Sequence, residues 1–164
     1  MGQATGDDRG AAVEIHDLRA AMTHRSVVAD RIWRAWWEPY GEPLSDVDAA
    51  LDTVLSATKF PFTLVAIRGG AFAGTATSIM ADIDARPGLG PCLAALWVEP
   101  EARGHGVAGM LISAVLELLS IQGCRQVYLS AKPHLRGFYE KNDWTLVESN
   151  IDGDKQDVFV RALT

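Results

Sequence analysis

The chain has 164 residues, which is the length of one domain and enough to bury roughly 70% of its unfolded surface around a single core. Its composition, 48% hydrophobic and 22% charged, is ordinary for a globular protein and excludes a disordered one. The formal net charge of -6 argues against binding to nucleic acid or to an anionic membrane, since both attract clustered Lys and Arg, and it suits a cationic substrate.

The first ten residues are polar and small, without the apolar run of a signal peptide or a membrane span. We therefore expect a loose tail over 1–10, a single domain over 11–164 and a cytoplasmic location. Cys92 and Cys124 lie far apart, with no CxxC pair and no nearby pair of histidines. This spacing predicts two reduced thiols, and neither a disulfide nor a metal site.

Hydrophobic periodicity predicts one series of elements along the domain. The first half reads as a strand over 13–18, a helix over about 20–37, a second helix capped by Ser45, and a hairpin of 62–67 and 71–80 around a glycine turn. After a loop over 82–91, the second half reads as a strand over 92–98, a helix from Val107 to Gly123, a strand over 126–130, a short helix over 133–141 and strands over 144–149 and 157–162. The predicted class is α/β or α+β with a central mixed sheet.

The stretch 99–112 holds Gly104, Gly106 and Gly109 at the G-x-G-x-x-G spacing of a dinucleotide-binding turn. That fold places the turn directly after a strand and an acidic residue about twenty positions later. Here further residues separate strand from turn, and 129–131 reads Leu-Ser-Ala. The surroundings argue against a dinucleotide site. They still predict an anion site, because a small-residue loop entering a long helix offers unpaired N–H groups and the positive end of the helix dipole.

Two motifs resemble those of the GCN5-related N-acetyltransferases (GNAT). "VEPEARGHGVAGMLI" is similar to the family's acetyl-CoA-binding pattern R/Q-x-x-G-x-G/A, with Arg103, Gly106 and Ala108 at its fixed positions. "GFYEKNDW" resembles the family's F-Y-x-x-x-G-F/W segment, except that Asp143 replaces the glycine and predicts a different turn, since Asp tolerates positive φ less readily. The loop "DIDARPGL" is similar to that of a subgroup of small bacterial acetyltransferases.

The resemblance implies a GNAT-type α/β (α+β) fold, with a central mixed, mostly antiparallel sheet of six to seven strands flanked by about four helices. It implies acetyl-CoA as cosubstrate and transfer of an acetyl group to a primary amine of a small molecule or of a peptide N-terminus. The implied cofactor-binding residues are Trp97, Val98, Arg103, Gly104, His105, Gly106, Val107, Ala108 and Phe138.

The resemblance also implies a catalytic role for Tyr139, which matches the tyrosine that donates a proton to the departing sulfur. Ala94 stands where some relatives carry a strand glutamate, so direct base catalysis from that position is excluded. The base stays open among four carboxylates in loops: Glu38, Glu42, Asp82 and Asp84.

The region between the first two helices forms one wall of the acceptor site in this family, which implies substrate contacts from Trp33, Trp37 and Tyr40, together with Asp84. Three functions remain open at this point. One is the N-acetyltransferase, the second is a CoA-binding sensor module that has kept the fold and lost turnover, and the third is an interaction domain without a cofactor. The assembly state also stays open, with a homodimer among the choices.

Overall fold

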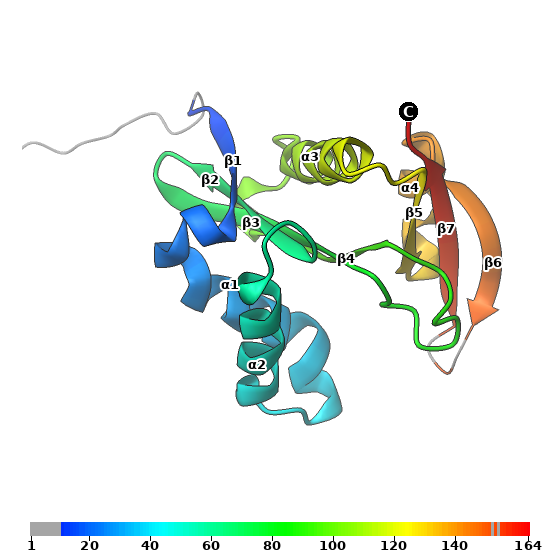
Figure 1. Ribbon diagram of the computed structural model, residues 1–164, viewed down its shortest axis with the longest axis horizontal. Helices are drawn as coiled ribbons and strands as arrows, with labels where there is room; N and C mark the ends of the chain where they lie inside the picture. The colour runs from blue at the N-terminus through cyan, green and yellow to red at the C-terminus, as the bar shows by residue number, and fades with distance from the viewer. Residues whose placement is uncertain (1–10, 152, 154) are drawn as a thin grey trace, which may run out of the picture.

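The computed structural model describes residues 11–151, 153 and 155–164, so the expected tail over 1–10 lies outside the described residues. A seven-stranded sheet in the order β1-β2-β3-β4-β5-β7-β6 runs through the molecule (Figure 1). Within the described chain β4 and β5 form the parallel pair, and the other neighbouring strands are antiparallel. The predicted fold class is therefore confirmed.

Every strand that the sequence predicts is present. The strands are β1 (Val13–Asp17), β2 (Phe62–Arg68), β3 (Ala71–Ile79), β4 (Cys92–Val98), β5 (Gln126–Ala131), β6 (Thr145–Ile151) and β7 (Gln156–Ala162). The hairpin turn between β2 and β3 uses Gly69 and Gly70, both at positive φ, which glycine adopts without steric cost.

The α-helices are α1 (Arg25–Ile32), α2 (Leu44–Ser56), α3 (Val107–Ile121) and α4 (Arg136–Lys141). The helix predicted from residue 20 begins only at Arg25, because Ala21 leaves helical geometry (φ -141°, ψ 46°) between two short 3₁₀ turns. The prediction that Ser45 caps the second helix is wrong. The helix begins at Leu44, so Ser45 lies inside its first turn. The N-cap is the extended Pro43, and no side chain caps the helix.

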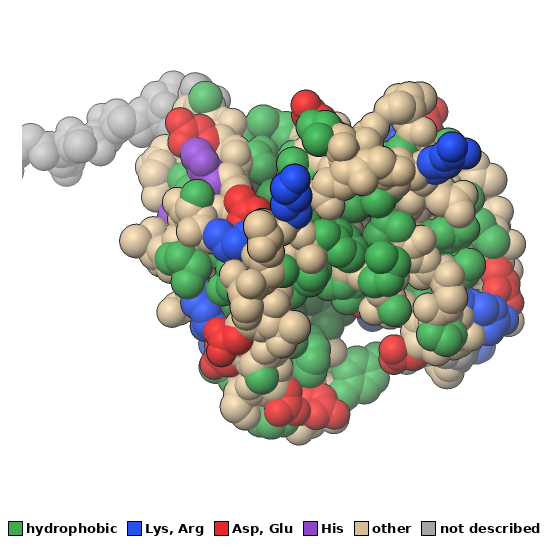
Figure 2. All heavy atoms as spheres, in the orientation of Figure 1, with side chains coloured by type: hydrophobic (Ala, Val, Ile, Leu, Met, Phe, Trp, Pro, Cys, Tyr) green, Lys and Arg blue, Asp and Glu red, His purple; other side chains and the backbone are tan. Residues whose placement is uncertain are grey.

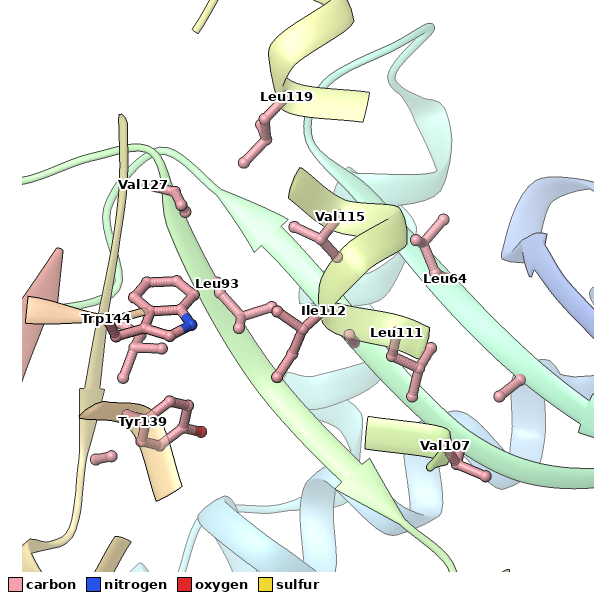
Figure 3. Close-up of a cluster of buried hydrophobic side chains, with 14 of the residues drawn as sticks. Leu64, Leu93, Val107, Leu111, Ile112, Val115, Leu119, Val127, Tyr139 and Trp144 are labelled. Carbon is pink, nitrogen blue, oxygen red and sulfur yellow. The ribbon is translucent and has the colours of Figure 1, made fainter. Parts of the chain in front are cut away.

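Helices cover both faces of the sheet (Figure 1). On one face α3 packs Leu111, Val115 and Leu119 into the largest buried cluster, which Figure 3 shows in close-up. On the other face, α1 and α2 pack Val28 and Leu51 against the sheet. This second cluster supports the segment between α1 and α2.

A close approach at Gly74 of β3 sets the position of the start of α3. A Cβ at this position would lie 2.7 Å from the Trp97 carbonyl oxygen, 3.2 Å from Leu111 and 3.3 Å from Val107. Only a residue without a side chain lets β3, β4 and α3 meet this closely.

The strands β4 and β5 separate soon after they pair. Their register holds only Cys92 opposite Tyr128, whereas β4 stays paired with β3 as far as Val98. The pairing of β3 with β4 is irregular between Thr75 and Thr77, and Ala95 lies there at φ 50°. We call the wedge between the separated strands the β4–β5 gap.

Candidate functional site

The glycine turn after β4 presents backbone donors. Gly104 (φ 81°) and Gly106 (φ 77°) are both left-handed, and Gly106 is the N-cap of α3. The first helical bond runs from Met110 N–H to the Gly106 carbonyl (3.1 Å), so the N–H groups of the residues between them have no acceptor within the helix. No side chain caps this end, and a Cβ on either glycine would meet nothing within 4 Å. The turn therefore has open space beside both glycines.

Arg103 turns back onto β4. Its Nε donates to the Val98 carbonyl (3.0 Å), and its guanidinium lies 5.0 Å from the centre of the Trp97 ring. The N–H of Glu99 donates to the Ala73 carbonyl of β3 (2.9 Å). Because successive residues of a strand direct their N–H and C=O groups to opposite sides, those of Val98 point away from β3. Val98, and not Trp97, thus directs backbone groups toward the β4–β5 gap. His105 is exposed in the turn.

Tyr139 lies in the wall of the gap opposite the start of α3. Only 7% of it is exposed, and its ring packs edge-on against Phe138 (5.1 Å) and Trp144 (6.0 Å). Figure 3 shows its hydroxyl turned toward the space between β4 and β5. Burial raises the pKa of Tyr139, so the hydroxyl stays protonated at neutral pH. It can act as a proton donor.

The turn that follows Tyr139 keeps the left-handed residue that the family's glycine would supply. Asp143 has φ 69°, and the Trp144 N–H donates to the Tyr139 carbonyl (3.0 Å). The expectation of a different turn at Asp143 is wrong, because a short polar side chain can occupy this region.

Glu99, a buried carboxylate that directly follows β4, joins two elements of the site. Glu99 accepts from the Arg31 Nε at 3.0 Å and from the Trp97 Nε1 at 2.9 Å. Burial alone would raise the pKa of Glu99, but the hydrogen bonds from Arg31 and Trp97 outweigh it, so the net shift is downward. No spacing in the sequence relates Arg31 of α1 to Glu99, since 68 positions separate them.

The segment between α1 and α2 carries the aromatic residues expected at the acceptor. Trp33 and Trp37 are half-buried against the second cluster, and the Trp33 Nε1 donates to the Glu42 carbonyl (2.7 Å). Trp36 and Tyr40 are 41% and 65% exposed. The structure thus uses Trp33 to shape the segment and leaves Trp36 and Tyr40 at its surface.

Figure 2 shows a hollow between this segment and the lobe that contains β6, β7 and the loop 80–91. We call it the acceptor hollow. Hydrophobic side chains form the wall on the side of the α1–α2 segment, and an acidic side chain lies at the opposite rim.

The loop 80–91 supplies two carboxylates, Asp82 and Asp84. Asp82 is exposed at the surface of the loop, yet desolvation by the protein around its carboxylate, together with the charge of Asp84, raises the pKa of Asp82. Arg86 does not pair with Asp84, because it binds the Glu148 carboxylate of β6 (Nε to Oε2, 3.0 Å). Arg86, the arginine of the same loop, therefore neutralises neither aspartate.

Among the described residues, no three His, Cys, Asp or Glu side chains gather as metal ligands do. Cys92 and Cys124 are free thiols, as predicted. Within the same part of the chain, no helix has the length and apolar character needed to cross a membrane.

Comparison with known proteins agrees with this arrangement. The model of the acetyltransferase (GNAT) family matches residues 29–144. A GNAT-family acetyltransferase from Staphylococcus aureus Mu50 is 14% identical with a TM-score of 0.69, over 93% of this chain and 100% of its own. ElaA from Escherichia coli is 19% identical with a TM-score of 0.68, over 92% of this chain and 99% of its own. An aminoglycoside 6'-N-acetyltransferase solved with coenzyme A is 16% identical with a TM-score of 0.69, over 92% of this chain and 97% of its own. A search of curated proteins gave no match.

Proposed function

The chain belongs to the GNAT family of acetyltransferases, and from that premise we propose that it transfers an acetyl group from acetyl-CoA to a primary amine of a small molecule or a peptide N-terminus. The observation that carries this proposal is the uncapped start of α3, whose first N–H groups have no acceptor within the helix and which follows a turn with open space beside Gly104 and Gly106. A phosphate at a helix N-terminus is favoured both by hydrogen bonds and by the helix dipole.

The residues of the turn fit coenzyme A. The Arg103 N–H already donates to the Pro100 carbonyl (3.3 Å), so the N–H groups from Gly104 to Ala108 would hold the pyrophosphate. A side chain at Gly104 or Gly106 would occupy the open space in front of the turn, where the pyrophosphate would lie. The backbone of Val98 would pair with the pantetheine arm as an added strand does. When bound, acetyl-CoA supplies the acetyl group as an activated thioester.

Two side chains of this chain would move protons. Tyr139 is protonated and faces the gap, which suits it to protonate the departing sulfur. Asp82 is the better of the loop carboxylates as the base that takes the proton of the amine, directly or through water. A raised pKa brings a carboxylate closer to the operating pH, and that is the condition for an efficient base.

The acceptor would lie in the acceptor hollow. Trp36 and Tyr40 offer exposed aromatic faces, which attract both apolar groups and ammonium ions. Asp82 and Asp84 stand on the loop of the facing lobe, and their negative charge would draw a protonated amine toward them. The hollow therefore favours an amine carried on an apolar body.

The test measures free thiol released from acetyl-CoA with a panel of amines, alongside the shift in melting temperature that acetyl-CoA causes. We expect binding and turnover with at least one amine. Binding without any turnover would favour the sensor module, and a melting temperature that acetyl-CoA leaves unchanged would overturn the proposal. The Asp82→Asn variant, run in the same assay, is expected to bind acetyl-CoA and to turn over slowly.

A matched pair of variants tests the turn itself. Gly106→Val and Gly123→Val both place a side chain at a positive φ with nothing within 4 Å, at opposite ends of α3. Each should lose about 1–2 kcal/mol of stability from backbone strain. Only Gly106→Val should abolish the rise in melting temperature that acetyl-CoA causes. Equal rises in the two variants would show that the turn is not part of the binding site.

A further inference from the structure

One buried polar atom of the described chain has no hydrogen-bond partner. Trp144 is 3% exposed, and its Nε1 is the single such atom among the buried side-chain nitrogens and oxygens of the described residues. The indole N–H groups of Trp33 and Trp97, by contrast, donate to the Glu42 carbonyl and to the Glu99 carboxylate. A buried N–H without an acceptor destabilises a fold, and so it calls for a physical explanation.

The place of this N–H suggests what it is for. In Figure 3 the Trp144 nitrogen is turned toward Leu93 of β4 and Ile112 of α3, and the Tyr139 hydroxyl points to the same side. The Trp144 and Tyr139 rings are 6.0 Å apart. Both lie where β4 has left β5, so the donor is aimed into the β4–β5 gap.

Bound water does not explain the N–H well. A buried water needs two to four polar partners, and apart from the Tyr139 hydroxyl the labelled side chains on that side of the nitrogen, Leu93 and Ile112, are aliphatic. The missing acceptor is better supplied by a ligand that reaches into the gap. Coenzyme A thioesters carry carbonyl oxygens in the two amides of the pantetheine arm and at the acyl end, and each of these oxygens can accept a hydrogen bond.

We infer that Trp144 is a ligand-binding residue, whose Nε1 donates a hydrogen bond to a carbonyl oxygen of the acyl-pantetheine arm in the β4–β5 gap. The inference rests on the proposed function, because it needs a CoA thioester as ligand. It adds a side chain to a contact otherwise made by backbone. It also explains why an aromatic core position carries an indole N–H that the free protein does not use.

Trp144→Phe tests this inference, because it keeps an aromatic ring and removes the N–H. Without ligand, the melting temperature of the variant should fall only by the effect of the smaller ring, because the substitution breaks no hydrogen bond. Its affinity for acetyl-CoA, measured by titration calorimetry, should fall about tenfold, as one lost hydrogen bond implies. An equal loss for CoA would assign the acceptor to a pantetheine amide, and a loss confined to acetyl-CoA would assign it to the thioester. Unchanged affinity for both ligands would overturn the inference.

Two comparisons keep the result interpretable. Trp33→Phe removes an indole N–H that is already bonded, so in the free protein it should lower the melting temperature by the loss of that bond as well as of the ring. If Trp144→Phe does not fold, the indole N–H of Trp144 can be followed by NMR in the unaltered chain. A shift and slower exchange on addition of acetyl-CoA would support the inference, and an unchanged signal would overturn it. If the unaltered chain does not bind acetyl-CoA, the proposed function fails first, and by a separate measurement.

Discussion

The tryptophans and Tyr139 have different roles in this protein, and their hydrogen bonds and burial distinguish them. The Trp33 indole holds the α1–α2 segment through Glu42, and the Trp97 indole binds Glu99 at the end of β4. Trp36 has an exposed ring. Tyr139 is buried and protonated beside the gap. The environment of each ring therefore indicates its role, whereas its residue type does not.

At the residue scale we predict that Tyr139→Phe lowers turnover and not affinity. The variant keeps the ring contacts with Phe138 and Trp144 and removes only the proton donor. A lost general acid lowers kcat by roughly 10²-fold or more. The measurement is kcat from thiol release together with the Kd of acetyl-CoA, which should stay within about twofold because no cofactor contact is removed. Unchanged turnover would show that another group protonates the sulfur.

At the scale of elements, the site depends on the packing of β3, β4 and α3. β4 brings Val98 to the gap, and α3 begins at Val107, which is fully buried against the sheet. Gly74 lets these elements approach, so a residue outside the glycine turn fixes the turn's position.

We therefore predict that Gly74→Ala damages both stability and cofactor binding. A Cβ 2.7 Å from the Trp97 carbonyl forces backbone to move, at a cost of about 1–3 kcal/mol. The displaced start of α3 should also weaken the binding of acetyl-CoA. Urea unfolding and calorimetry measure the two effects. Gly88→Ala is the control, because its Cβ meets nothing within 4 Å and it should change stability by less than about 0.5 kcal/mol. If Gly74→Ala kept the stability and the acetyl-CoA affinity of the unaltered chain, the close packing of β3, β4 and α3 at Gly74 would be contradicted.

At the scale of the whole molecule, the Arg31–Glu99 pair joins the helical layer of α1 to the end of β4, immediately before the glycine turn. Glu99 is buried, so the pair is screened by solvent less than the other pairs of α1, such as Arg34 with Asp30. The pair thereby joins α1 to the segment that precedes the glycine turn.

This pair should make stability dependent on pH. The pKa of Glu99 in the folded chain lies below its ordinary value, so the pair contributes stability above the unfolded pKa and loses it as pH falls through the folded pKa. Glu99→Gln should therefore lower stability by about 1–2 kcal/mol at pH 7, through weaker hydrogen bonds, and should lose less on acidification to about pH 3, which lies well below the ordinary pKa of a glutamate. Urea unfolding at the two pH values measures this. Glu101→Gln, which removes an exposed carboxylate nearby, is the control, and an equal acid loss in both variants would contradict the prediction.

Local sequence was sufficient to predict the strands, the long α3 helix and the glycine turn. Each of these depends on interactions between near neighbours: alternation, helical spacing, and the left-handed φ of Gly104 and Gly106. The start of α1 was not predictable in this way, since the interruption at Ala21 breaks no local pattern.

The sequence by itself therefore determined the fold class, the family and the place of the glycine turn before α3, because short-range patterns encode all three. Only the tertiary structure decided which side chains surround that turn. It paired Arg31 with Glu99, turned Arg103 back onto Trp97, and aimed the Trp144 N–H into the β4–β5 gap. These contacts join residues on different elements, and their distances follow from how sheet and helices pack, which no spacing along one chain records.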